Sequence, residues 1–166
     1  MSDTKPLDDR ARRGLLALAR QSILSVLQRG ALPDIDGPES KAKSSLGVFV
    51  TLNIDGVMRG WIGKLEGDGH LEHDVMEMAA AAATQDERFE PLTAADVRHT
   101  EIELTLIDRV HPIWPDDVVV GTHGLYVVRD RHRAVILPQV AVQEGWDAST
   151  FLGECARRAG LEAEAY

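Results

Sequence analysis

The segment Arg59-Gly60-Trp61-Ile62-Gly63 combines residue types that could hold a ligand. The Arg59 guanidinium could pair bidentately with a carboxylate or phosphate, and Gly60 and Gly63 would let a ligand approach the backbone. Trp61 could stack against a planar ligand. The structural alternative is a β-bulge in which Arg59 pairs with a nearby acid and Trp61 is a core or rim side chain. The sequence leaves both interpretations open.

Four polar residues elsewhere are further candidates for the same site. Arg88 could contact an anion, or could be a cation favoured by the dipole at a helix C-terminus. Glu103 could accept a proton, or could lie in solvent on the polar face of a strand. His123, in a turn between glycines, could donate, accept or ligate, although turn histidines without such a role are common. Gln139 follows a proline at a strand end, where its amide could bind a ligand or hold the loop backbone.

Known catalytic signatures are absent from the sequence. His70 and His73 would share a helix face, but their order is not His-Glu-x-x-His, and an exposed turn is expected at 67–69 just before them. We therefore expect no metal site there. Cys155 falls in an apolar stripe and is expected to be a small core residue. Neither a Gly-x-x-x-x-Gly-Lys loop nor a Cys-x-x-Cys pair occurs, so the sequence defines no reaction and no cofactor.

Alternating helical and strand periodicities predict the elements that must position these residues. Five consecutive alanines in the second helix would let its backbone approach a sheet closely. In the strand after it, Ile102, Leu104 and Leu106 point to one side and glutamates to the other. The expected elements are helix Asp8–Gln28, a loop over Gly30–Ser45, strands Leu46–Leu52 and Val57–Ile62 around the turn Asn53–Gly56, helix His70–Gln85, strand Thr100–Asp108, strands Val118–Val120, Leu125–Val128 and Ala134–Leu137, and a helix capped by Asp147 that runs through Arg158 to a stop at Gly160.

Short turns between successive strands, with helices set apart, predict a mainly antiparallel central sheet covered by helices. The expected fold class is α+β, and 166 residues fit a single domain.

Composition disfavours several classes of function. The net charge of −9 opposes nucleic-acid binding as the main role, and the arginines at 10–13 and 129–133 are expected on a helix surface and in a turn. No apolar run is long enough to span a bilayer, and the N-terminus does not resemble a secretory signal. A single cysteine fits a reducing compartment, so the expected location is the cytoplasm. The sequence does not predict the oligomeric state.

Several segments occur in the order typical of one known family. They are Gly47–Leu52, Arg59–Gly63, Asp86–Leu92, Ile102–Leu104, Gly121–Leu125, Leu137–Ala141, Gly145-Trp146 and the tail with Phe151-Leu152, Cys155 and Ala159–Leu161. In these segments the chain resembles the AMMECR domain family, named for the AMME-syndrome chromosomal region, whose microbial members are called AmmeMemoRadiSam system protein A. The resemblance covers roughly 14–161, which we expect to be the AMMECR-like domain. Residues 1–13 are then an N-terminal extension and helix start, and 162–166 a short tail.

Two departures from the family pattern bear on function. The family usually reads Leu-Arg-Gly-Cys-Ile-Gly, whereas this chain has Met58 and Trp61 at the first and fourth places. A mechanism that needs a thiolate at position 61 cannot operate here. Typical members also continue into another short strand, whereas this sequence stops at Tyr166.

The resemblance implies a central antiparallel sheet with a smaller subdomain, and association with Memo-type and radical-SAM proteins. It implies no settled activity. Two hypotheses follow. In the first, the protein holds a small anionic or planar ligand: Arg59 anchors it, Trp61 stacks, Arg88 balances charge, and Glu103 or His123 moves protons. In the second, it is a non-catalytic module whose sheet edge and Trp61 surface dock on a partner.

Overall fold

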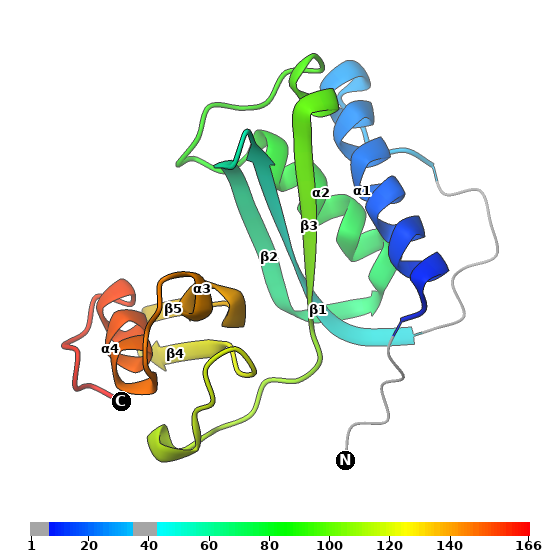
Figure 1. The fold of residues 1–166 in the computed structure, drawn as a ribbon. Coiled ribbons are helices and arrows are strands. Elements are labelled where there is room, and N and C mark those ends of the chain that lie inside the picture. The colour runs from blue at the N-terminus through cyan, green and yellow to red at the C-terminus, as the bar shows by residue number, and fades with distance from the viewer. Residues whose placement is uncertain (1–6, 35–42) are drawn as a thin grey trace. The chain divides into compact units, whose positions relative to one another are not determined.

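The structure of the protein, a computed structural model, describes residues 7–34 and 43–166. The chain divides into two compact units, one ending at Arg109 and the other comprising Val110–Tyr166 (Figure 1). Both units combine helices with antiparallel strands, which confirms the α+β class. None of the helices in the described residues has the length and apolar character required to cross a membrane.

An antiparallel sheet of three strands, in the order β2-β1-β3, forms the centre of the first unit. Its strands are β1 (Lys43–Ile54), β2 (Val57–His70) and β3 (Thr100–Ile107). Asp55 and Gly56, at φ 51° and 76°, form the tight turn between β1 and β2. The antiparallel pairing of β1 with β2 confirms the expected hairpin. Positive φ angles explain why Asp and Gly occupy its turn.

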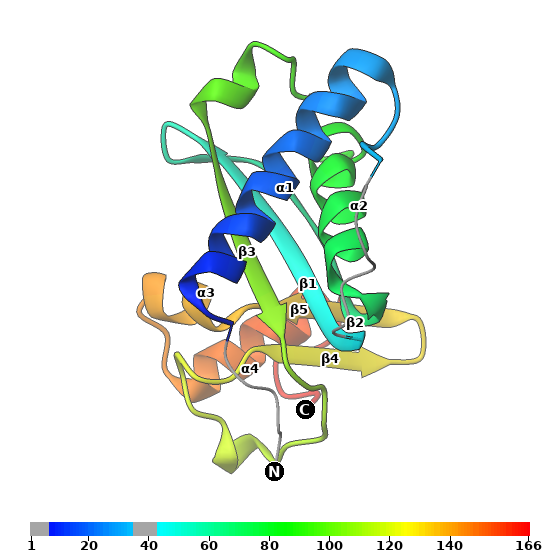
Figure 2. The same ribbon diagram turned by 90° about the vertical axis from the view of Figure 1, so that its right-hand side faces the viewer.

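Two helices cover one face of this sheet (Figures 1 and 2). Helix α1 (Asp9–Arg29) begins where the Asp8 carboxylate accepts a hydrogen bond from the Ala11 amide at 2.7 Å, and ends at Gly30 in the left-handed region. Helix α2 (Leu71–Thr84) carries the alanines. A short 3-10 helix η1 (Asp96–His99) leads into β3.

Side-chain alternation places the core of the first unit between the sheet and the helices. Val48, Val50 and Leu52 of β1 are fully buried against Ala19 and Ile23 of α1 and the alanines of α2. On β3, the even-numbered apolar side chains pack against this core while Glu101 and Glu103 are exposed, as the alternation predicts.

The expected turn at 67–69 is wrong, because β2 continues to His70 instead of ending at Ile62. Gly67 lies inside the strand, where an added Cβ would meet the Leu46 carbonyl oxygen at 2.4 Å and an Asp74 carboxylate oxygen at 2.7 Å. The glycine therefore permits close packing. The expected loop over Gly30–Ser45 also ends early, since β1 begins at Lys43, and its 35–42 portion lies outside the described residues.

The second unit consists of a β-hairpin with helices packed on it. Its core surrounds Phe151 and Cys155, both fully buried. Burial raises the pKa of the Cys155 thiol, which fits the expected core role. The elements are a single-turn 3-10 helix η2 (Pro115–Asp117), strands β4 (Leu125–Arg129) and β5 (His132–Ile136), and helices α3 (Pro138–Gln143) and α4 (Ala148–Arg158).

Local signals explain most boundaries in this unit. The Asp147 carboxylate accepts from the Thr150 amide at 2.7 Å and begins α4, and Gly160 at φ 78° follows its end. The expected strand Val118–Val120 is wrong. Val118 and Val119 follow η2 without regular structure, and Val120 begins a turn in which the Val119 carbonyl accepts hydrogen bonds from the amides of Thr122 and His123.

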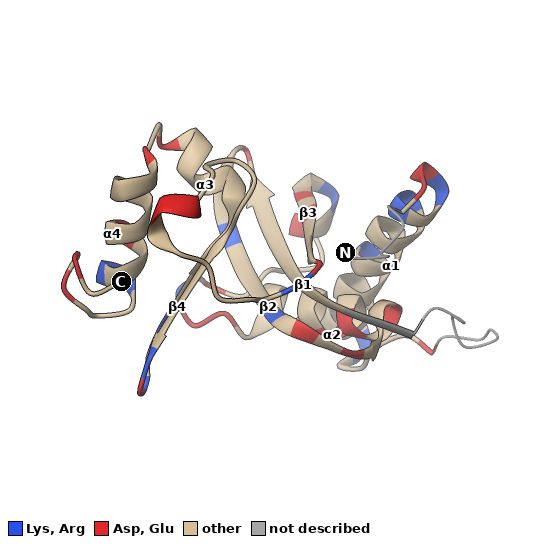
Figure 3. Ribbon diagram, turned by 90° about the horizontal axis from the view of Figure 1, so that it is seen from below, with Lys and Arg blue, Asp and Glu red and all other residues tan. Residues whose placement is uncertain are grey.

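Charged residues of both signs are spread over each unit (Figure 3). The arginines at 10–13 lie on the surface of α1, and those at 129–133 lie at the exposed β4–β5 turn, as expected.

Candidate functional site

The Arg59–Gly63 segment lies on β2, an edge strand of the sheet. Leu52 of β1 pairs with Gly60, but the next residue, Asn53, pairs with Met58. Arg59 therefore occupies a β-bulge, the backbone arrangement of the structural alternative. Beyond the bulge, Trp61 and Gly63 lie on the sheet face opposite the helices, next to Thr51 and Phe49.

Both glycines of the segment are required by close packing. An added Cβ at Gly60 would lie 2.2 Å from the carbonyl oxygen of Ala82, so this glycine lets β2 approach the α2 backbone. At Gly63, an added Cβ would lie 2.4 Å from the ring of Phe49. Each glycine thus has a contact within the protein that explains its presence.

The backbone of Trp61 is held by an ion pair that follows α2. The Trp61 amide donates to one Asp86 carboxylate oxygen at 2.8 Å, and Arg88 donates to the Trp61 carbonyl oxygen at 2.8 Å. Arg88 also makes a bidentate pair with Asp86, at 2.8 and 2.7 Å. The Asp86–Arg88 pair therefore satisfies the outward backbone groups of the edge strand at Trp61, as a neighbouring strand would.

This pair remains ionised at neutral pH. The hydrogen bonds from Arg88 are the largest influence, and with the Trp61 amide they outweigh burial and lower the pKa of Asp86 to about 2. The hydrogen bond to Asp86 in turn raises the pKa of Arg88.

The indole of Trp61 is also in contact with protein groups. It stacks on the Phe49 ring, with centroids 5.0 Å apart and planes inclined by 20°. The Arg88 guanidinium lies 5.5 Å from the Trp61 ring centre and 5.4 Å from that of Phe89. Trp61, Phe49, Asp86, Arg88 and Phe89 thus form one cluster, which we call the Trp61 cluster.

Arg59 does not belong to this cluster. Its side chain is half-buried, and no hydrogen bond or ion pair reaches the guanidinium from any described residue. Hydrogen bonds from Thr93 are the main cause of the lowered pKa of Asp96, and the charge of Arg59 contributes to it. The Arg59 guanidinium therefore lies within electrostatic range of the Asp96 carboxylate.

Glu103 lies in the same row of the sheet as Trp61, with Thr51 between them. Two strand spacings separate the backbones of Trp61 and Glu103 by about 10 Å. Glu103 also lines a groove of about 520 Å³ between α1 and β3. The other residues that line this groove, which we call the α1–β3 groove, are Leu7, Arg12, Leu15, Leu16, Ile102, Leu104 and Leu106.

His123 and Gln139 belong to the second unit. The His123 ring accepts a hydrogen bond through Nδ1 from the Val119 amide at 3.1 Å, which stabilises the turn before β4. Gln139 lies half-buried in the first turn of α3. Within the first unit, the structure brings Trp61 and Arg88 into contact and places Arg59 and Glu103 apart from them.

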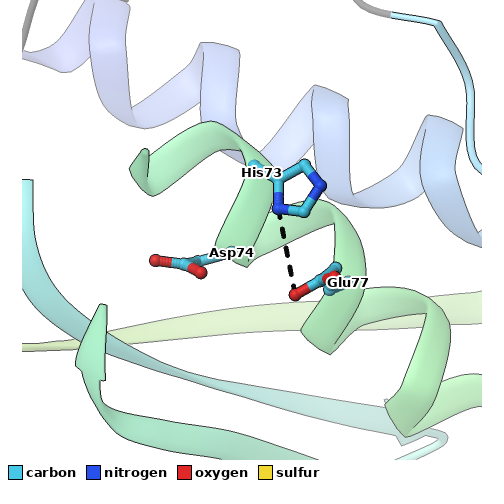
Figure 4. A group of neighbouring side chains, drawn as sticks. All are labelled: His73, Asp74 and Glu77. Carbon is cyan, nitrogen blue, oxygen red and sulfur yellow. Dashed lines mark ion pairs between the residues drawn. The ribbon is translucent and has the colours of Figure 1, made fainter. Parts of the chain in front are cut away.

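A group of potential metal ligands lies on α2, formed by His73, Asp74 and Glu77 (Figure 4). The Lys64 Nζ already lies among these acids, 2.7 Å from Asp74 and 3.4 Å from Glu77. Burial would lower the pKa of Lys64, but its hydrogen bonds to Asp68 and Asp74 and their charges outweigh burial and raise it. The ammonium therefore supplies the positive charge that a cation would supply.

Sequence reasoning missed Phe49, Lys64, Asp74 and Asp86. Asp74 is fully buried and also accepts from the Asp68 amide at 3.0 Å, so it joins β2 to the start of α2. The position of Asp86 two residues before Arg88 is the one local signal that could have indicated a pair.

Comparison with known proteins identifies the family. The AMMECR1 family model matches residues 16–166, and the chain belongs to this family. A protein from Methanothermobacter thermautotrophicus is 36% identical over 172 residues, covering 97% of this chain and 88% of that protein. Protein Mbar_A1807 from Methanosarcina barkeri is 34% identical over 172 residues, covering 96% and 84%. The crystal structure of the uncharacterized protein PH0010 from Pyrococcus horikoshii aligns with a TM-score of 0.84 at 30% identity, covering 95% of this chain and 83% of that one.

Proposed function

We propose that this protein is a non-catalytic interaction module that binds a segment of a partner protein along the α1–β3 groove. The groove itself carries the proposal. Its lining residues are apolar except Arg12 and Glu103, and its volume of about 520 Å³ suits a row of side chains. Leu16, on the α1 wall, is 37% exposed. Apolar grooves with polar rims are typical of sites that bind peptide segments.

The two edges of the sheet support this choice of surface. At the β2 edge, the backbone groups of Trp61 are occupied by Asp86 and Arg88. At the opposite edge, no strand pairs with the outer side of β3 within residues 7–34 and 43–166. An unpaired strand edge beside an apolar groove can bind a partner through backbone and side-chain contacts together.

Membership in the AMMECR1 family supports the partner class. The resemblance to AmmeMemoRadiSam system protein A points to Memo-type and radical-SAM proteins as partners. The Trp61 cluster is a less suitable docking surface, because its aromatic rings already pack on each other and on Arg88.

Leu16→Asp tests the groove. We expect isothermal titration calorimetry with purified Memo-type and radical-SAM proteins of the same organism to show binding that this variant weakens at least about tenfold, because a carboxylate replaces buried apolar contact. The matched control is Val57→Asp, since Val57 is 63% exposed at the β1–β2 turn and should retain wild-type affinity. Unchanged affinity of Leu16→Asp would reject the groove, and no binding to either partner would reject the partner class.

Binding of a small anionic ligand at Arg59 is the second candidate function. It is favoured by the half-buried guanidinium, which no described residue contacts by a hydrogen bond or ion pair. Gly60, Trp61, Gly63 and Arg88 are its neighbours in this candidate, although their groups are engaged within the protein. Proton transfer by Glu103 also belongs to it.

Thermal shifts with a metabolite extract test this candidate. We expect an anionic component to raise the melting temperature of the wild-type protein and to have no effect on Arg59→Ala. Arg98→Ala is the control, because Arg98 is an exposed arginine of η1, the short helix that also contains Asp96. Identical responses of wild type and Arg59→Ala to every fraction would remove Arg59 as an anchor.

A further inference from the structure

We propose that the partner segment is an extended chain that alternates apolar residues with lysine or arginine and adds to the outer edge of β3 as a fourth strand. This inference rests on the proposed docking function and specifies its occupant. It follows from the position of β3 in the sheet and from the different character of its two faces.

The edge available for pairing has a defined beginning. The Arg20 guanidinium of α1 donates to the carbonyl oxygen of Thr100 at 2.8 Å, and also to that of Val97. This contact holds the start of β3 to α1. From Glu101 to Ile107 the strand pairs with β1 on its inner side, and none of the described residues forms a strand on its outer side. An added strand would extend the sheet there.

One face of β3 opens into the α1–β3 groove. Ile102, Leu104 and Leu106 line the groove together with Leu15 and Leu16 of α1, and the charged residues Arg12 and Glu103 also border it. The three β3 side chains are only partly buried, although they pack against the core of the first unit. Alternate side chains of an added strand would lie on this face beside them, where apolar residues would complete their burial.

The other face of β3 is acidic at the same edge. Glu101 and Glu103 are both exposed and lie two residues apart, so they project from the same side of the strand. Residues of an added strand on that side would lie about 5 Å away, where cross-strand pairs of opposite charge are favourable and like charges are not. The net charge of −9 attracts a cationic segment at long range as well.

The same charges disfavour an alternative partner for this edge, the β3 strand of a second copy of this chain. Pairing of two β3 edges would bring together two strands with glutamates on one face, within a dimer of chains that each carry a net charge of −9. Acidic residues on an edge strand are a known protection against such pairing. They therefore select a basic partner and oppose self-association.

Synthetic peptides test this inference directly. The probe is a fluorescent peptide of alternating lysine and valine, eight residues long to match β3. We expect fluorescence anisotropy to show that it binds the full chain at least about fivefold more tightly than a peptide with the same lysines and valines in two blocks, or than an alternating glutamate–valine peptide. Hydrogen exchange should slow at β3 amides when the alternating peptide is bound.

A charge-reversed variant provides the decisive comparison. The double variant Glu101→Lys/Glu103→Lys should lose the preference for the lysine–valine peptide and prefer the glutamate–valine peptide. The double variant Glu87→Lys/Glu90→Lys is the matched control, because it changes the net charge equally at exposed positions outside β3 and should retain the wild-type preference. If both double variants change in the same way, net charge alone explains binding and the inference is overturned.

Failure of this inference is distinguishable from failure of the docking function. If Leu16→Asp abolishes binding of the purified partner but neither alternation nor charge affects peptide binding, the groove binds a segment of another kind and the inference is overturned. If Leu16→Asp leaves partner binding intact, the docking function itself is overturned.

Discussion

Gly60→Ala is expected to destabilise the protein by about 3 kcal/mol. The added methyl carbon would lie 2.2 Å from the carbonyl oxygen of Ala82 and 3.0 Å from its carbonyl carbon. Both atoms belong to the backbone of α2, so relief requires the helix to move away from β2, which disrupts packing against buried residues such as Val75 and Ala79. Overpacking against backbone is among the costly single substitutions in a core.

Urea unfolding followed by circular dichroism measures this effect, with Gly14→Ala as the control. Gly14 lies within α1, and no atom lies within 4 Å of a Cβ added there. Alanine should therefore stabilise the helix by about 0.5–1 kcal/mol. Replacement of glycine by alanine is therefore expected to lower the unfolding free energy at position 60 and to raise it at position 14. An unfolding midpoint of Gly60→Ala equal to that of the wild type would show that α2 does not approach β2 in this way.

Lys64→Met is expected to cost about 3 kcal/mol of unfolding free energy. The Asp74 carboxylate is completely buried, and Lys64 is its positively charged partner at 2.7 Å. Removal of the ammonium leaves a buried charge whose remaining described hydrogen bond comes from the Asp68 amide. The effect should exceed that of an exposed ion pair, because solvent does not screen Asp74.

Two further variants separate this buried pair from the rest of the network. Asp68→Asn removes the charge of the other close acid of Lys64, but the Asp68 side chain is 73% exposed, so the loss of unfolding free energy should be much smaller than that of Lys64→Met. The double variant Lys64→Met/Asp74→Asn should recover at least about 1 kcal/mol relative to Lys64→Met, because the buried charge is gone. If Asp68→Asn lowers the unfolding free energy as much as Lys64→Met does, the buried Lys64–Asp74 pair is not the main contribution of Lys64 to stability.

The Trp61 cluster explains how position 61 can depart from the usual cysteine of the family. Asp86 and Arg88 bind the amide and carbonyl groups of residue 61, and these groups do not depend on the side chain. Trp61 adds its own stacking on Phe49. The feature of this segment that the structure supports is the occupation of the Trp61 backbone groups at the β2 edge by Asp86 and Arg88.

That occupation also accounts for the asymmetry of the sheet. At one edge the backbone groups of Trp61 are occupied by a local ion pair, whereas the other edge lies beside an apolar groove. Proteins usually prevent unwanted pairing at both edges of a sheet. In this protein the β3 edge is protected by charge, through Glu101 and Glu103, which leaves it open to a partner of opposite charge.

The sequence by itself determined the features that depend on residues close together in the chain. The apolar periodicity predicted α1, α2 and β3, Asp147 marked the start of α4, and Gly30 began the loop expected after the first helix. These predictions were correct because helix caps, tight turns and amphipathic faces depend on residues within about four positions of each other.

Only the tertiary structure decided which glycines and charges are structural. Gly67 reads as a turn residue until it is seen against Leu46 and Asp74, and for this reason the length of β2 was underestimated. The Trp61–Asp86 contact spans 25 positions, and the buried Lys64–Asp74 pair joins a strand to a helix. Such contacts form when elements pack, and no pattern of neighbouring residues encodes which partners will meet.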